Sequence, residues 1–252
     1  MEKIPEIKMK PTVKLMDYVG LVHCAQAIRV CRDNGELSDS IIYPNGERAL
    51  GDKDKDLIIR VGQKSKHESV LEHVVLQFHI KDVSRACLQE IARHRMASIT
   101  VRSSRYTLKK HLANEEYFEY KYSDLHRAEK YVVFTGIPKT DKSIISALNN
   151  LISSFREDSS SRGGSCNKSN DVIKYAMPEA LKTEFFWTIN ARSLRNFLHL
   201  RTSPHALKEI RLLSTMIYYE LCNEALSWLF EDVIKQEDLL FDYLGIEYNT
   251  DD

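Results

Sequence analysis

The sequence lacks an excess of charge of either sign. Its 252 residues include 36 Lys and Arg and 36 Asp and Glu, so the formal net charge is zero. Such a chain has no bulk electrostatic field that would draw it to nucleic acid or to an anionic membrane surface. We therefore expect no nucleic-acid partner, and any site for an anion must be built locally.

Long apolar runs are also missing. No run approaches the roughly 18 to 20 residues that cross a bilayer, and the N-terminal segment MEKIPEIKMK lacks the apolar core of a signal peptide. We expect a cytoplasmic protein with no membrane partner.

Cysteine is scarce and scattered, without the CxxC pairs of zinc sites and redox motifs. The five cysteines are Cys24, Cys31, Cys87, Cys166 and Cys222, and we expect free thiols. His67, His73 and His79 are spaced six apart, unlike the i, i+4 pair of a helical zinc site, so we expect no metal. GxGxxG and GxxxxGK[ST] motifs are absent, which disfavours Rossmann and P-loop folds.

The chain length suits one large domain, and we expect a single domain over residues 1–252. The patterns predict a strand over 12–20 that ends at Gly20, a helix over 23–32 with Ala25, Ile28 and Cys31 inward, a strand over 74–80, a helix opening at 82–84, and a strand over 117–122. They further predict a loop over 159–170, one helix over 183–201, and another that starts at Ser203-Pro204 and runs toward Val233.

Positive charge is concentrated in the segment ARHRMASITVRSSRYTL, residues 92–108. Consecutive residues of the Arg93-His94-Arg95 triplet point in different directions, so the triplet can contact more than one anionic group. Ser103, Ser104 and Arg105 add hydroxyl, amide and guanidinium donors that suit a phosphate monoester. The alternative interpretation is a solvated basic helix end that complements the helix dipole.

A second polar cluster lies in NARSLRNFLHLRTSPH, residues 190–205. On a helix Arg192 and Asn196 would share one face, while Asn190 and Arg201 would share the opposite one. An arginine on a buried face needs an anionic or carbonyl partner. For Arg201 that partner is either a ligand or an internal carboxylate, and the sequence leaves both possibilities open.

Three motifs together resemble the flavin-dependent thymidylate synthase (ThyX) family. RHRMASITVRS matches the family's RHR-x7-S signature, FFWTINARSLRNFLHLR resembles its second hallmark, and HESVLEHVVLQFHI resembles its third. The resemblance implies reductive methylation of dUMP to dTMP, with methylenetetrahydrofolate as carbon donor, FAD reduced by NADPH as hydride source, and no enzyme nucleophile on uracil C6.

The resemblance also implies roles for individual residues. The positions that match the family's flavin-binding residues are His67, Ser69, Glu72, Arg93, His94, Arg95, Asn190, Arg192, Asn196 and His205. Those that match its dUMP-binding residues are Glu90, Arg93, Arg102, Ser103, Ser104, Arg105, Lys174 and Arg201. Arg201 is the catalytic residue in this interpretation, because its guanidinium would stabilise negative charge on the pyrimidine.

Some positions depart from the family pattern. Glu90 stands where relatives often carry Gln, Val101 where some carry an acidic residue, Ser104 where Gly is found, and Lys174 where others place an Arg on the nucleotide from a neighbouring subunit. The resemblance implies an α/β (α+β) fold, with a mainly antiparallel sheet packed with long helices, in a homotetramer with shared active sites. Two other hypotheses stay open: a nucleic-acid-binding module, and a flavoprotein of the same ancestry without dUMP chemistry.

Overall fold

The structure, a computed structural model, describes residues 9–31, 33–161 and 171–246. The described residues divide into two compact units. Unit 1 comprises those within Met1–Pro11, Lys81–Ile91 and Thr100–Phe185, and unit 2 those within Thr12–Ile80, Ala92–Ile99 and Phe186–Asp252. The single domain expected over residues 1–252 stays a prediction.

Strands and helices are mixed along the chain. The strands are β1 (Thr12–Val19), β2 (Ile41–Ile42), β3 (Arg48–Ala49), β4 (Val75–Ser84), β5 (Ala97–Val101) and β6 (Lys182–Asn190). The α-helices are α1 (Leu21–Val30), α2 (Asp52–Ile58), α3 (Arg85–Ala92), α4 (Ser104–Leu112), α5 (Tyr122–Ala128), α6 (Pro138–Ser161), α8 (Ala191–Arg201), α9 (Lys208–Asn223) and α10 (Phe241–Leu244). Short helical segments are η1 (Gly35–Leu37), η2 (Ile59–Lys64), η3 (Glu68–His73), η4 (Lys174–Ala176), η5 (Ser227–Leu229), η6 (Glu231–Val233) and η7 (Gln236–Asp238).

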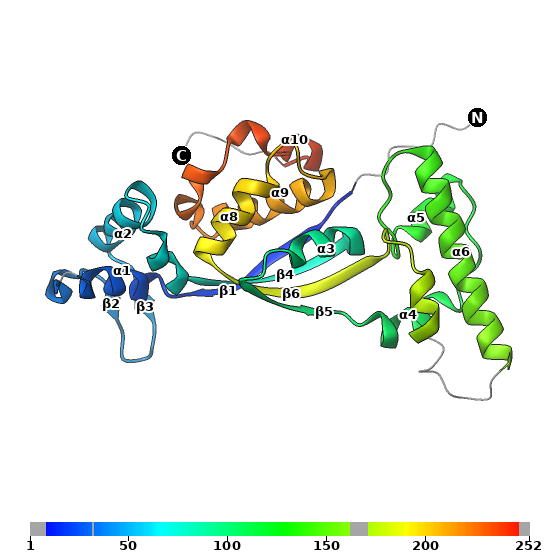
Figure 1. The fold of residues 1–252 in the computed structure, drawn as a ribbon, viewed down its shortest axis with the longest axis horizontal. Helices are drawn as coiled ribbons and strands as arrows, with labels where there is room; N and C mark the ends of the chain where they lie inside the picture. Colours follow the sequence, from blue (N-terminus) through cyan, green and yellow to red (C-terminus); the bar gives the residue numbers. More distant parts are fainter. Residues whose placement is uncertain (1–8, 32, 162–170, 247–252) are drawn as a thin grey trace. The chain divides into compact units, whose positions relative to one another are not determined.

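Four strands form one sheet in the order β1-β4-β6-β5, and β2 pairs with β3 in a separate antiparallel ribbon. Helices α8 and α9 lie along one face of the sheet (Figure 1). Helix α9 packs on β1, where the Glu220 carboxylate accepts a hydrogen bond from the Leu15 amide at 3.1 Å. The expected mixed fold of helices and antiparallel sheet is confirmed.

The burial pattern of strand β6 shows why helices pack on one face of the sheet. Thr183, Phe185, Trp187 and Ile189 are buried at every second position, while the alternate residues are more exposed. A period of two is the signature of a strand with one buried face. In unit 2 the buried Trp187 ring packs edge-on against Phe197 of α8, with ring centroids 5.0 Å apart, so the apolar side chains of this strand join the helix above them.

The turn between β1 and α1 requires glycine. Gly20 has a φ of +99°, which side-chain-bearing residues rarely adopt. A Cβ at this position would also lie 1.9 Å from the carbonyl oxygen of His73. The expected strand ending at Gly20 is therefore confirmed, and the bare backbone lets η3 approach α1 closely.

The core of unit 1 surrounds the long helix α6. Phe118 is buried in this core beside Leu148 and Phe155 of α6. The side-chain amide of Asn149 accepts from the Phe118 amide at 2.9 Å and donates to the Phe118 carbonyl at 2.8 Å. The expected strand over 117–122 is wrong, because this side chain satisfies the backbone groups that a neighbouring strand would have bonded.

The single helix expected over 183–201 is also wrong. The segment is strand β6 up to Asn190, followed directly by α8. Asn190 is the N-cap, and its side-chain oxygen accepts from the Ser193 amide at 2.8 Å. The placement of Asn190 and Arg201 on one helical face fails for the same reason, since Asn190 precedes the helix.

Other boundaries differ as well. Helix α9 begins at Lys208 rather than at Ser203-Pro204 and ends at Asn223, and α3 begins at Arg85 because residues 82–84 continue β4. Strand β5 and helix α4 were not predicted. Cys31 is exposed rather than inward, although Cys24, Cys31, Cys87 and Cys222 are all free thiols as expected. Of the loop expected over 159–170, residues 159–161 belong to α6 and the remainder lies outside the described residues.

Candidate active site

Helix α8 carries most of the predicted site residues of unit 2. Its inner face is apolar: Leu194, Phe197 and Leu198 are buried. Arg192 and Asn196 are exposed, four residues apart on the outer side. The helix begins where β6 ends, because the Asn190 cap replaces a connecting loop and the Ala191 amide donates to the Val74 carbonyl at 2.8 Å. The sheet therefore fixes where the polar face of α8 starts.

Arg201, the last residue of α8, meets the imidazole of His94. The guanidinium Nε donates to His94 Nε2 at 3.2 Å, so the proton of the neutral His94 ring sits on Nδ1. His94 also rests on Phe197, with ring centroids 4.9 Å apart and planes at 74°. Two segments 107 residues apart in the chain are thus joined, and Arg201 is half-buried.

The flanking arginines of the triplet have different surroundings. Arg93 and Arg95 are both exposed between α3 and β5. Of the segment 67–73, His67, Ser69 and Glu72 are exposed as well, and Glu72 forms an ion pair with Arg192 Nη1. The pair ties η3 to α8, and it shows that part of the predicted positive charge is neutralised by a neighbouring carboxylate.

The guanidinium, imidazole and amide groups of unit 2 fit a flavin dinucleotide. FAD offers a pyrophosphate and a ring with carbonyl acceptors, and both match the donors of Arg93, Arg95 and Asn196. Asn190 contributes its side-chain oxygen to the cap, which leaves its amide nitrogen as the group that can donate to a ligand. The donor set is thus compatible with the predicted cofactor.

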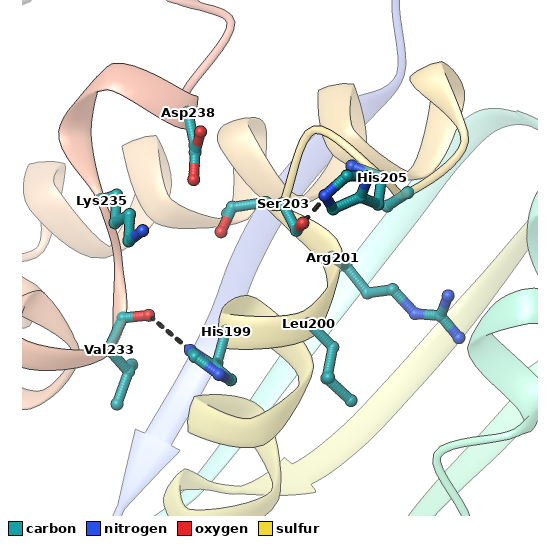
Figure 2. Close-up of a pocket in the computed structure, with 10 residues that line it drawn as sticks. His199, Leu200, Arg201, Ser203, His205, Val233, Lys235 and Asp238 are labelled. Carbon is teal, nitrogen blue, oxygen red and sulfur yellow. Dashed lines mark hydrogen bonds between the residues drawn. The ribbon is translucent and has the colours of Figure 1, made fainter.

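A cavity of about 460 Å³ opens beside the C-terminal end of α8. Its walls are formed by His199, Leu200, Arg201, Thr202, Ser203, His205, Ala206, Val233, Lys235 and Asp238. Figure 2 shows the Arg201 guanidinium turned away from Lys235 and Asp238. His199 Nδ1 lies 3.4 Å from the Val233 carbonyl, so α8 and η6 meet at the wall of this cavity. Of the predicted site residues, Arg201 and His205 line this cavity.

Unit 1 carries the predicted dUMP-binding residues other than Arg93 and Arg201, which belong to unit 2. Ser103 is the exposed N-cap residue of α4 and Ser104 is the first residue of that helix. The unpaired backbone N–H groups of a helix start suit a phosphate group. Arg102 pairs with Glu184 at 3.4 Å and donates to the Lys182 carbonyl at 3.2 Å. The side chain of Arg105 lies outside the described atoms.

Two further predicted dUMP-binding residues of unit 1 lie on short helices. Glu90 is half-buried on α3, and Lys174 is exposed in η4. Among the described residues, no cluster of three or more His, Cys, Asp or Glu side chains is arranged to hold a metal ion. Nor is any helix in the described ranges long and apolar enough to cross a membrane.

The sequence interpretation missed Arg195, whose side chain is only 1% exposed inside unit 2. Its Nη1 and Nη2 donate to the two carboxylate oxygens of Asp232 at 2.6 and 2.7 Å, and Nη1 also donates to the Leu229 carbonyl. Burial alone would raise the pKa of Asp232, but the hydrogen bonds and charge of Arg195, assisted by Lys66, hold it below its ordinary value. Helical spacing places Arg195 on the buried face with Leu194 and Leu198, and this is the signal in the sequence that could have found it.

Comparisons with known proteins agree on one family. The family model described as thymidylate synthase complementing protein (Thy1) matches residues 14–225. The flavin-dependent thymidylate synthase of Wolinella succinogenes is 46% identical over 213 residues, which cover 84% of this chain and 94% of the relative. That of Helicobacter pylori is 42% identical over 218 residues, covering 86% and 96%.

Solved structures give the same result. A crystal structure of thymidylate synthase X (ThyX) from Helicobacter pylori with FAD and dUMP superposes with a TM-score of 0.77 at 40% identity, covering 90% of this chain and all of that one. A second structure of that enzyme, also complexed with FAD and dUMP, gives a TM-score of 0.76 at 42% identity. The chain therefore belongs to the flavin-dependent thymidylate synthase (ThyX) family.

Proposed function

We propose that this chain converts dUMP to dTMP, with methylenetetrahydrofolate giving the carbon and FAD, reduced by NADPH, giving the hydride. The observation that carries the proposal is the pairing of Arg201 with His94 at the end of α8. It brings the catalytic residue expected from the second family motif against the central residue of the first. The family membership and the donor set around α8 support the same reaction.

Arg201 would activate the pyrimidine electrostatically. A guanidinium held at N3 and O2 of uracil stabilises the negative charge that develops there when a hydride is added to C6. The hydrogen bond from its Nε to His94 fixes the plane of the guanidinium.

The cofactor would be held by the outer face of α8 and the triplet. Arg93 and Arg95 supply guanidinium donors for its phosphates, and Asn190, Arg192 and Asn196 supply donors along α8. His67, Ser69, Glu72 and His205 complete the predicted flavin contacts. When bound there, FAD supplies the reducing chemistry, while these residues orient it and keep its phosphates neutralised.

The phosphate of dUMP would bind at the start of α4. Ser103, Ser104 and Arg105 offer hydroxyls, a guanidinium and helix N-terminal amides in one short segment. Arg93, Arg102 and Glu90 belong to the same predicted site. Lys174, from a neighbouring subunit, would add a positive charge without the bidentate fork of the arginine found in relatives.

The proposal includes the assembly. The family resemblance predicts a homotetramer in which one subunit completes the site of another, and residues 1–252 acting as a single catalytic domain. Size-exclusion chromatography with light scattering tests the tetramer, since a monomer that retains full activity would contradict shared sites. The cytoplasmic location expected from the sequence stays a prediction that cell fractionation would check.

The visible spectrum of the purified protein, titrated with dUMP, is the first test. Bound FAD should give flavin absorption that shifts on addition of dUMP, and tritium should be released from C5-labelled dUMP when methylenetetrahydrofolate and NADPH are present. A colourless protein that also fails to bind added FAD would refute the proposal. NADPH oxidation without tritium release would identify instead a flavoprotein that lacks dUMP chemistry.

The assignment of Arg201 is tested by two matched arginine variants. Arg201→Ala should lower tritium release on the order of a thousandfold while most FAD stays bound, because the lost charge acts on the pyrimidine. Arg105→Ala should instead chiefly raise the Kd for dUMP. If Arg201→Ala loses its flavin and added FAD restores turnover, the catalytic assignment is wrong.

A further inference from the structure

Arg195 lies where three segments of unit 2 meet. It is on the inner face of α8, it forms a bidentate ion pair with Asp232 of η6, and its Nη2 is 3.6 Å from the Glu68 carboxylate of η3. Its third partner is the carbonyl of Leu229 in η5. One buried guanidinium thus joins α8, the helix that carries Arg195 itself, to η3, η5 and η6.

Each of these segments contributes to the site. Segment η3 carries Ser69 and also Glu72, the carboxylate that pairs with Arg192. The chain after Asp232 supplies part of the cavity wall, where the Val233 carbonyl meets His199 of α8. A displacement of either segment from α8 would therefore change the cavity beside Arg201 or the surface to which the flavin is predicted to bind.

The wall that follows Asp232 lies beyond the part of the chain that matches the family model, which ends at residue 225. Arg195 itself occupies one of the variable positions of the NAR-x3-NF-x3-R motif. Arg195 joins the inner side of α8 to the start of this segment, because it donates to the Leu229 carbonyl and to the Asp232 carboxylate.

Stability alone does not account for the pair. Desolvating two charges offsets much of their attraction, so well-packed apolar residues in place of such a pair often leave a protein equally stable. The Nε of Arg195 is buried and has no hydrogen-bond partner among the described residues, a further cost that an apolar side chain would avoid. What an apolar pair cannot supply is the fixed geometry of a two-pronged ion pair.

We propose that Arg195 is a positioning residue of the active site, which holds the wall formed by residues 229–238 and segment η3 at fixed places against α8. The inference rests on the proposed function, because the geometry that it secures is that of the flavin and nucleotide site. It assigns to Arg195 and Asp232 no contact with substrate or cofactor.

The test separates stability from positioning with a single and a double variant. Arg195→Met should lower Tm by about 10 °C, since it leaves Asp232 without its main partner. Arg195→Met combined with Asp232→Leu should regain most of that loss. In the double variant the Kd for FAD should nonetheless stay raised on the order of tenfold, and amide hydrogen exchange over residues 229–238 should stay faster than in the wild type.

Arg29→Met is the matched control. Arg29 forms the other buried arginine–aspartate pair of unit 2, with Asp54 at 2.6 Å, and this pair joins α1 to α2. The control should lower Tm as Arg195→Met does, but it should leave the Kd for FAD and the exchange of residues 229–238 unchanged.

The outcomes distinguish this inference from the proposed function. If the double variant has the wild-type Tm, the wild-type Kd for FAD and the wild-type amide exchange over residues 229–238, the positioning role is overturned and the pair is merely structural. The same conclusion follows if Arg29→Met raises the Kd for FAD as much as the double variant does. A wild-type protein that binds no FAD would overturn the proposed function itself, and the role of Arg195 in that site with it.

Discussion

Phe197 links the aromatic core of unit 2 to Arg201, the arginine proposed to be catalytic. Its buried ring meets the Trp187 ring at 5.0 Å and 69°, and the His94 ring at 4.9 Å and 74°. His94 in turn accepts the hydrogen bond from Arg201. Replacing Phe197 with Leu keeps an apolar side chain in the core but removes both edge-to-face contacts, so we expect a loss of stability together with a loss of order at His94.

The size of the loss follows from the contacts. The smaller side chain costs about 1–2 kcal/mol of free energy of unfolding, and each lost ring pair adds about 0.5–1.5 kcal/mol. Phe134→Leu is the matched control, because Phe134 is buried in the core of unit 1 and the described residues supply it no ring pair. Phe197→Leu should therefore lower Tm by about 4–8 °C more than the control does.

Two assays check the two parts of this reasoning. Calorimetry of both variants measures the difference in Tm, and tritium release measured well below both Tm values reports on the catalytic arginine. Phe197→Leu should reduce the turnover number on the order of tenfold, because a His94 that leaves its place no longer orients Arg201, whereas the control should keep wild-type turnover. Equal Tm losses in the two variants would show that the rings contribute nothing, and unchanged turnover would show that Phe197 does not hold His94.

Two predictions concern groups away from the catalytic arginine. Burial would raise the pKa of Asp54, but hydrogen bonds from Ser38, Ser40 and Arg29 hold it below its ordinary value near 3.8, so this carboxylate stabilises the protein above about pH 4 and the contribution is lost as the pH falls through the lowered pKa. Asp54→Asn should accordingly flatten the dependence of unfolding free energy on pH between about pH 2 and 4, and an unchanged slope in urea titrations would contradict this. Burial raises the pKa of Cys24 to about 12, so at pH 8 only about one molecule in ten thousand carries its thiolate. Iodoacetamide should modify exposed Cys31 well before Cys24, as peptide mass spectrometry would show, and equal rates would refute the burial argument.

The sequence predicted most accurately where local pattern and tertiary environment agree. The strand before Gly20 and the strand that became β4 were both foreseen. Strand β6 was not, because Phe186 interrupts the alternation of apolar and polar residues that marks a half-buried strand. The structure explains this phenylalanine, which stacks on His79 at 4.5 Å on the more exposed side of the sheet, a contact that no local pattern reveals.

The sequence motifs identified many residues of the proposed site, but not the contacts that these residues make with one another. The motifs identified Arg201 and His94, but their hydrogen bond joins residues 107 positions apart and could not be read from spacing. Arg195 escaped notice because it lies between the fixed positions of the family motif, and its partner Asp232 lies 37 residues further along the chain. Buried ionic pairs between distant segments depend on tertiary structure, which the sequence pattern alone does not specify.

The direct passage from β6 to α8 restricts how this enzyme can change. Since the helix starts at the residue after the strand, one inserted or deleted residue at that junction would rotate all later side chains by about 100° around the helix axis. Arg201 would then point away from His94, and Phe197 would leave the aromatic core. Substitutions can accumulate along α8, but its length from the junction to Arg201 must stay constant for the enzyme to work.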